Sequence, residues 1–304
     1  MSSLLQVERI NFLKNLLSSE TFVYGPPTAD TKKKYPQIKQ VPSIADSSSL
    51  SSISISNHIF KIIEAETSEK VTYLKKKPNG QSLGAKFERS ISGFLNSTFP
   101  NLQNIRPGIW VIQQLGNRGA KDISDFVQYE HLSSLKALSK ASKELAAALG
   151  NDYTVAPDIV IYREPLGDDM INKNQVIVCD DIAKATSLRS CNSDLPILHS
   201  SISAKITMRS DRAQNSRTEA LNLIRNRKGH LPHVVVCTAE PLPGRLASLA
   251  LGTGDIDCVY HACLYELVDA VNSVGSEDAK DILDTLISGK RLKDISDLPL
   301  DLAI

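Results

Sequence analysis

The chain has 304 residues, with 35 lysines and arginines, 34 acidic residues and 41% hydrophobic residues. This length can bury a large core, and the composition is that of an ordinary water-soluble protein. No stretch approaches the ~18 consecutive apolar residues of a membrane span, and residues 1–19 lack the basic start of a secretion signal. The five cysteines form no CxxC pair, so we expect reduced thiols, no zinc site and a cytoplasmic location.

The N-terminal third is predicted to begin with a helix and to continue through a polar arm. Residues 1–19 place leucine and isoleucine at helical spacing. Residues 23–57 hold two adjacent prolines, a basic run and a serine-rich segment, which together predict a flexible surface loop. The alternative is an arm that becomes ordered on a ligand. A helix follows at residues 81–95, with Leu83, Phe87, Ile91 and Leu95 in one apolar stripe.

From residue 108 onward, apolar strand-like segments alternate with helical ones, which predicts an α/β fold. The expected strands are 108–115, 153–162, 175–179, 198–208, 233–238 and 256–260. The expected helices are 131–149, 210–226, 243–251, 263–274 and 277–288. We find no repeat and no strong linker, so we predict one domain over residues 1–304, with the polar arm at about 23–57.

One stretch, residues 203–228, is strongly basic, although the net charge of the whole chain is only +1. Residues 205–228 hold seven lysines and arginines but only two acids, an excess that can bind an anion. We predict that a strand ends near Lys205 and that a helix capped by Ser210 or Asp211 runs to about Asn226. The expected polar face of this helix carries Arg212, Asn215 or Ser216, and Glu219. The buried side is expected to include Ala213, Ala220, Leu221 and Ile224.

A carboxylate and a lysine stand at the ends of two predicted strands. Asp158 lies near the start of one strand, and Lys205 ends another. On neighbouring strands they can cleave a phosphodiester: the carboxylate binds Mg²⁺, and the lysine holds or deprotonates the attacking water. A second acid is then needed for the metal, and Glu219 and Glu88 are the candidates. From spacing alone, a surface salt bridge between Asp158 and Lys205 is the favoured interpretation.

The cluster Arg209-Ser210-Asp211-Arg212 changes that balance. Arginine presents two donors to guanine O6 and N7, and aspartate accepts from the cytosine amino group. At a helix N-terminus the cluster can therefore read adjacent G·C pairs in the major groove. The alternative is a capping aspartate between two solvated arginines. This alternative does not explain why the cluster begins only four residues after the proposed catalytic lysine.

At these residues the sequence resembles the NgoMIV family of type II restriction endonucleases, within the PD-(D/E)xK nuclease superfamily. The resemblance covers most of the chain from about Gln81 onward. It is carried, in order, by APDIV, SISAK, RSDRAQN, the following Arg-Thr-Glu, RNRKGHLPH, TAEP, ALGTGDIDCVYH and GKRLKDISDLPLDLA. It implies a restriction-endonuclease-like α/β fold, with a central mixed β-sheet flanked by α-helices. This family has serine in place of the usual (D/E)xK acid, here Ser203, and moves the acid to the next helix, here Glu219.

The resemblance implies a Mg²⁺-dependent endonuclease for a palindromic duplex site with a CCGG core, most closely GCCGGC, cut to leave 5′ overhangs. The implied catalytic residues are Asp158, Lys205, Glu219, Ser203 and, in a supporting role, Glu88. The implied metal ligands are Asp158, Glu219 and the main-chain carbonyl of Ala204.

DNA contacts are implied in the same way. Arg209, Asp211 and Arg212 correspond to residues that read the CCGG core. Arg245 corresponds to the reader of the outer guanine, and Gln81 to a minor-groove contact. The family's outer-cytosine contact comes from an aspartate in the N-terminal third, which departs here in length and sequence. Asp46 with Ser48 is the best match, and Asp30 is an alternative.

The resemblance also implies an assembly. Double-stranded DNA is the expected partner, bound by a homodimer that assembles into a homotetramer cutting two sites together. A cognate DNA methyltransferase is expected in the same cell. Two alternatives stay open. One is a repair or recombination nuclease of the same superfamily, which does not need Arg209 to Arg212 at base edges. The other is a catalytically silent, sequence-specific DNA-binding protein.

Overall fold

The computed structural model describes residues 2–304 except 77, 116–120, 145–146, 148–155 and 253. Within them the helices are α1 (Leu4–Ser18), α2 (Ala29–Lys34), α3 (Leu50–Thr67), α4 (Gly80–Thr98), α5 (His131–Ala141), α7 (Asp168–Ile171), α8 (Ser210–Asn226), α9 (Pro243–Ala250), α10 (Leu264–Val274), α11 (Glu277–Ser288) and α12 (Leu298–Asp301). The strands are β1 (Tyr24–Gly25), β2 (Val41–Pro42), β3 (Trp110–Gln114), β4 (Ile159–Arg163), β5 (Ile197–Lys205), β6 (His233–Thr238), β7 (Cys258–His261) and β8 (Leu292–Asp294). No helix in these ranges is long and apolar enough to cross a membrane.

The central sheet is mixed and follows chain order, β3-β4-β5-β6-β7-β8. Strands β3, β4 and β5 pair antiparallel, whereas β6, β7 and β8 pair parallel. The predicted α/β class, a mixed sheet flanked by helices, is confirmed. The chain divides into two compact units. The first holds residues 1–101, 203–217 and 235–304, and the second holds 102–202 and 218–234.

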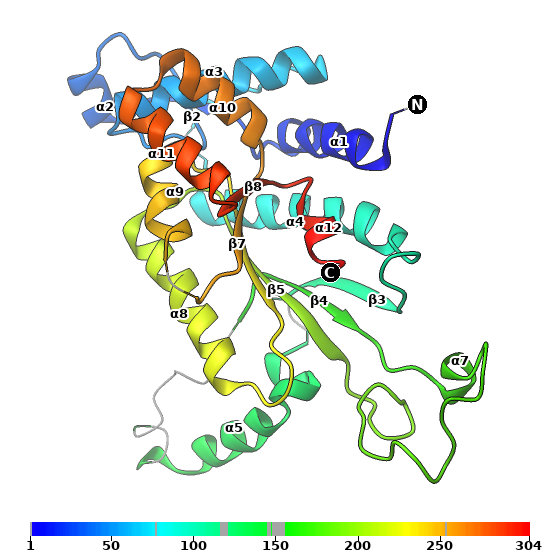
Figure 1. The fold of residues 1–304 in the computed structure, drawn as a ribbon. Helices are drawn as coiled ribbons and strands as arrows, with labels where there is room; N and C mark the ends of the chain where they lie inside the picture. The colour runs from blue at the N-terminus through cyan, green and yellow to red at the C-terminus, as the bar shows by residue number, and fades with distance from the viewer. Residues whose placement is uncertain (1, 77, 116–120, 145–146, 148–155, 253) are drawn as a thin grey trace. The chain divides into compact units, whose positions relative to one another are not determined.

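In the first unit, helices pack in pairs whose apolar stripes face each other. Helix α10 packs on α3, and α1 packs on α4 (Figure 1). The rings of Phe12 on α1 and Phe94 on α4 lie 5.5 Å apart. The parallel strand β7 is buried at every residue, as expected for a parallel strand with both faces covered.

Helix α1 also contributes a buried cation to this unit. The Arg9 guanidinium, only 8% exposed, donates from Nη2 to Glu266 Oε2 at 2.7 Å and from Nε to Asp294 Oδ1 at 2.9 Å. Burial alone lowers the pKa of Arg9, but the hydrogen bonds to both carboxylates raise it overall. Removing one member of such a buried group leaves charge uncompensated in a dry interior, so Arg9 fixes α1 to α10 and β8.

His261 is a second buried titratable group in this unit. Its Nδ1 accepts from the Cys263 N–H at 3.1 Å, so its Nε2 carries the proton and donates to the Glu240 carbonyl at 3.2 Å. Burial lowers its pKa from the ordinary value of 6.5 to about 4. The ring is therefore neutral in the folded protein at any pH near neutrality.

The second unit is built on the antiparallel part of the sheet. Strand β4 lies between β3 and β5, with Ile161 opposite Ile112 on one side and Ser200 on the other. The Gln128 side chain bonds the start of β5: its Nε2 donates to the Leu198 carbonyl at 2.7 Å, and its Oε1 accepts from the Leu198 N–H at 3.0 Å.

Several expected elements agree closely with the structure. Strand β6 and helix α11 have the predicted limits, and α8 covers the predicted 210–226. The predicted strand at 153–162 begins only at Ile159, and residues 153–155 lie outside the described range. Much of the predicted end of the 131–149 helix also lies outside it, and α5 ends at Ala141.

The predicted strand at 175–179 is wrong. This segment forms no strand, and Val176 and Ile177 are 77% and 64% exposed. The Asn172 Oδ1 accepts from the N–H groups of Ile177 and Val178 at 2.8 and 3.0 Å. A side chain therefore bonds the backbone groups that a neighbouring strand would need.

The flexible loop predicted within the polar arm is wrong for Leu50–Asn57, which form the first turns of α3. Ser49 caps the helix by accepting from the Ser52 N–H. Ile53 and Ile55 are buried, and so are the serines at 52 and 56. The segment is rich in serine, but it carries the first part of an apolar face that extends along the rest of the helix.

The buried, neutral His261 predicts a pH-dependent stability. Between about pH 4 and 6.5 the unfolded chain binds a proton at this histidine that the folded protein does not bind. The free energy of unfolding should therefore fall as pH decreases through this range, by about 3 kcal/mol in total, and should be unaffected by this group above pH 6.5. The free energy of unfolding can be measured by urea unfolding from pH 4 to 8. In His261→Gln it should depend less steeply on pH than in the wild type. His58→Gln, at a half-buried position on α3, is the control, and an equal change of slope there would contradict the assignment.

Candidate active site

Strand β5 ends at the residues singled out in the sequence. Ser203 and Ala204 are 8% and 2% exposed, and Lys205, the last strand residue, is half-buried. The Ser203 Oγ lies 3.1 Å from the Oγ of Ser216, which is itself only 2% exposed. This hydrogen bond joins the end of β5 to the first half of α8, directly before Lys205.

Lys205 lines a hollow of about 300 Å³. Helical spacing on α4 places Gln81 and Glu88, seven residues apart, along one side of it. The hollow is lined by Gly80, Gln81, Gly84, Ala85, Glu88, Ala204, Lys205, Ile206 and Arg212. The first unit therefore brings together five of the residues predicted for the site. Glu88 is half-buried and Gln81 is exposed.

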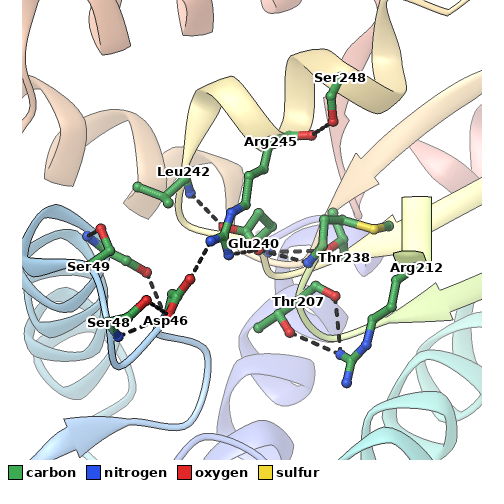
Figure 2. A network of polar contacts seen from close by, with 12 residues as sticks. Asp46, Ser48, Ser49, Thr207, Arg212, Thr238, Glu240, Leu242, Arg245 and Ser248 are labelled. Carbon is green, nitrogen blue, oxygen red and sulfur yellow. Dashed lines mark hydrogen bonds and ion pairs between the residues drawn. The ribbon is translucent and has the colours of Figure 1, made fainter. Parts of the chain in front are cut away.

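The two arginines of the base-reading cluster line a second hollow, of about 260 Å³, which the polar arm helps to form. Arg209 is exposed, and Arg212 is half-buried. The Arg212 Nη1 donates to Thr207 through the main-chain oxygen at 3.3 Å and through Oγ1 at 3.0 Å. Thr207 thus sets the direction of the Arg212 guanidinium (Figure 2). Asp211 is exposed in the first turn of α8.

The start and the buried side of α8 differ in detail from the prediction. The Arg209 carbonyl accepts from the Ala213 N–H at 3.0 Å, so the cap falls at Arg209, one residue before the predicted Ser210 or Asp211. The buried stripe is Ala213, Ser216, Ala220 and Leu223. Leu221, expected on the buried side, is 37% exposed because it lies one residue away from this stripe.

Arg245 on α9 meets the polar arm. Its Nη2 is hydrogen-bonded and ion-paired to Asp46 Oδ2, and its Nη1 lies 3.8 Å from Glu240 Oε2 (Figure 2). Ser48 donates to Asp46 Oδ1 from its N–H at 3.0 Å and from its Oγ at 2.7 Å. Burial alone raises the pKa of Asp46, but the bonds from Arg245 and Ser48 hold it well below its usual range. Asp30, by contrast, is exposed on α2.

Glu240 contacts Arg245 and was not among the residues predicted from the sequence. Its side chain is fully buried; Oε2 accepts from the Met208 N–H at 2.7 Å, and Oε1 accepts from the Leu242 N–H at 3.2 Å. Burial raises its pKa to about 7, against the lowering effect of the Met208 bond and the Arg245 charge. The available signal was an acid directly after the apolar run VVVCTA, where a carboxylate needs buried partners.

The other two predicted acids belong to the second unit. Asp158 is half-buried, directly before β4, and its carbonyl accepts from the Leu115 N–H at 3.0 Å. Glu219 is half-buried within α8. Strand β4 pairs with β5 so that Ile159 lies opposite Ile202. Among the described residues, no three His, Cys, Asp or Glu side chains gather as a metal site.

Comparison with known proteins defines the class of the protein. The chain is 50% identical over 264 residues to the type II restriction enzyme NgoMIV of Neisseria gonorrhoeae, a match that spans 87% of this chain and 90% of the relative. The protein is a type II restriction enzyme, a site-specific deoxyribonuclease. Residues 30–304 match the model of the NgoMIV restriction enzyme, and the chain belongs to that family, as the sequence motifs predicted.

Proposed function

We propose that the protein hydrolyses double-stranded DNA at a palindromic site with a CCGG core, GCCGGC, using Mg²⁺ and leaving 5′ overhangs. The family supports the reaction class. The observation that carries the proposal is the hollow that Lys205, Glu88, Gln81 and Arg212 share. An ammonium group for the phosphate and a guanidinium for a base edge then act from one surface.

Asp158, Glu219 and the Ala204 carbonyl are the proposed Mg²⁺ ligands. All three offer hard oxygen atoms, which are the donors that Mg²⁺ prefers, so the donor set fits the metal. The family motifs support the grouping, since Asp158 lies in APDIV, Ala204 in SISAK and Glu219 in the Arg-Thr-Glu that follows RSDRAQN. When bound, Mg²⁺ supplies positive charge to the scissile phosphate.

The side chains of the chain itself perform the remaining work. Lys205 orients or deprotonates the attacking water and offsets charge that develops on the phosphate oxygens. Glu88 lines the same hollow and supports the lysine. Ser203 stands at the usual acid position, and its hydrogen bond to Ser216 fits a role in holding the strand end. One phosphodiester bond is hydrolysed in each strand.

Arg209, Asp211 and Arg212 read the CCGG core in this proposal. Two guanidinium groups offer donor pairs to guanine, and the carboxylate between them accepts from a cytosine amino group. Arg209 and Asp211 are exposed at the start of α8, as base readers must be. Gln81, exposed in the first turn of α4, is the proposed minor-groove contact.

The outer base pair is read by Arg245 and by Asp46 with Ser48. Guanine offers acceptors to Arg245, and cytosine offers an amino donor to Asp46. The Arg245 and Asp46 side chains are paired with each other. In a complex with DNA, guanine would offer acceptors to Arg245 in place of Asp46, and the cytosine amino group would offer a donor to Asp46 in place of Arg245. This pairing supports Asp46 over Asp30 as the outer-cytosine contact.

Assembly into a homodimer, and of two dimers into a homotetramer, is the proposed form. A palindrome is matched by a twofold dimer. The connection between β4 and β5 exposes the large apolar side chains Met170, Val176, Ile177 and Ile182, each at least 50% exposed, which suits a self-association surface. We further propose a cytoplasmic location and a cognate DNA methyltransferase in the same cell.

Digestion of a plasmid with Mg²⁺ tests the proposed specificity. A plasmid with mapped GCCGGC sites should give discrete fragments with 5′ overhangs at those sites. A matched plasmid that carries CCGG only in other flanks should stay intact. A smear would favour the repair or recombination nuclease, and binding without cleavage would favour the silent DNA-binding protein.

Asp158→Ala should abolish cleavage and leave specific binding, because the metal loses a carboxylate while the base readers are untouched. Cleavage and gel-shift assays on one GCCGGC duplex measure the two properties. Asp281→Ala, at an exposed position on α11, is the matched control and should cut normally. Full cleavage by Asp158→Ala would remove this residue from the metal site.

Arg212→Ala should weaken discrimination between GCCGGC and core-altered duplexes, by about 1–3 kcal/mol for each base that the arginine reads. Arg225→Ala removes the same charge from the opposite end of α8 and should keep the discrimination. Competition binding with the GCCGGC duplex and a core-altered duplex gives the ratio of the two affinities. Uniform weakening on all DNA by Arg212→Ala would show instead that this side chain binds phosphate.

A further inference from the structure

The fully buried Glu240 lies where the two proposed base-reading elements meet. One element is the β5–α8 connection, residues 206–209, and the other is the start of α9, which carries Arg245. The Ala239 N–H donates to the Ile206 carbonyl at 3.1 Å, and the Glu240 Oε2 accepts from the Met208 N–H at 2.7 Å. Two hydrogen bonds from neighbouring residues therefore hold the connection on either side of Thr207.

The same carboxylate holds the start of α9. Its Oε1 accepts from the Leu242 N–H at 3.2 Å, and the Arg245 Nη1 lies 3.8 Å from Oε2. Glu240 is itself fixed from behind, because its N–H donates to Thr238 Oγ1 at 3.2 Å and its carbonyl meets His261. Figure 2 shows the carboxylate between Arg245 on one side and the Thr207–Arg212 contact on the other.

Thr207 carries this restraint to the core-reading arginine. It accepts two hydrogen bonds from Arg212 Nη1, and its neighbours Ile206 and Met208 are only 5% and 1% exposed. The main chain is thus hydrogen-bonded on both sides of Thr207, and the Arg212 guanidinium bonds to Thr207. A chain of contacts therefore runs from Arg245 through Glu240 and Met208 to Thr207 and Arg212.

A carboxylate is a costly way to fill a buried space, since an apolar side chain of similar volume needs no partners. Glu240 instead bonds two main-chain N–H groups from different connections and also faces a guanidinium. The two carboxylate oxygens of Glu240 have three partners and fix the direction of each one. Apolar packing is not directional and would not do this. The arrangement is suited to fixing geometry where small displacements alter base contacts.

We propose that Glu240 is a positioning residue for sequence discrimination, which keeps the core reader Arg212 and the outer reader Arg245 in fixed alignment. This inference rests on the proposed function. Glu240 touches no base; it acts through Met208, Leu242 and Arg245. Because one carboxylate serves both elements, its removal disturbs the reading of the outer pair and of the core together.

Glu240→Gln is the test, because it keeps the volume and one acceptor oxygen but replaces the other oxygen with a donor. Values of kcat/KM are measured for duplexes with GCCGGC, with the outer pair changed (ACCGGT) and with the core changed (GCATGC). The ratio of the GCCGGC value to each other value should fall about tenfold or more in Glu240→Gln. Glu240→Asp keeps the carboxylate on a side chain that is shorter by one methylene group. Its two kcat/KM ratios should lie between those of Glu240→Gln and those of the wild type.

Glu266→Gln is the matched control, since Glu266 is an equally buried glutamate of the same unit that bonds Arg9 instead. Thermal melts fix an assay temperature at which all variants are folded. Glu266→Gln should lose stability and keep both ratios, as expected of a purely structural carboxylate. If Glu240→Gln does not fold, Glu240→Asp gives the same comparison.

The outcomes separate this inference from the proposed function. A wild-type enzyme without preference for GCCGGC would overturn the proposed function itself. A wild-type enzyme with that preference, beside a Glu240→Gln enzyme that keeps both ratios within about twofold, would overturn only the role of Glu240. A fall in one ratio alone would also overturn it, because a shared anchor requires both to fall.

Discussion

The two arginines that we propose as base readers, Arg212 and Arg245, must each be held in a defined direction, and the structure gives both of them polar partners. Arg245 lies between Asp46 and Glu240, and Arg212 is held by the oxygen atoms of Thr207. Asp46 and Glu240 offset the positive charge of Arg245. Arg212 is oriented by neutral oxygen atoms instead.

The proposed catalytic end of the site is held in a similar way. Lys205 is the last residue of a buried strand, and its base is fixed by the contact between Ser203 and Ser216. Ser203 allows a hydroxyl pair to join strand and helix. The chemistry that we propose would therefore start from a tightly packed strand end, with Asp158 and Glu219 as the proposed acids.

The sequence predicts best those elements whose pattern is local. Helix α11 and strand β6 are recovered because their apolar periodicity and end signals agree. The segment at 175–179 has the same apolar pattern as a strand, but whether it pairs depends on a partner, and Asn172 takes its N–H groups. Helix α3 is hidden by its serines, since composition weighs polar residues without regard to the face they occupy.

The site follows the same rule. Motifs suffice to propose Lys205, Arg209 and Arg212, because these residues are close together in sequence. The pairing of Asp46 with Arg245 joins residues 199 positions apart, so the sequence leaves Asp46 and Asp30 open. Glu240 is missed for a related reason: its meaning lies in the main-chain groups of Met208 and Leu242, which have no signature in residue type.

The salt-bridged Arg9 has a consequence for where the folding unit begins. Helix α1 lies wholly before residue 30, where the match to the family model starts. An N-terminally truncated protein starting there would lack the cation that neutralises Glu266 and Asp294, which are 1% and 0% exposed. Two carboxylates would then face each other in a dry interior, so the shortened chain would have to take up protons or open α10 to water. The leading helix is an integral part of the scaffold, although it carries none of the proposed chemistry.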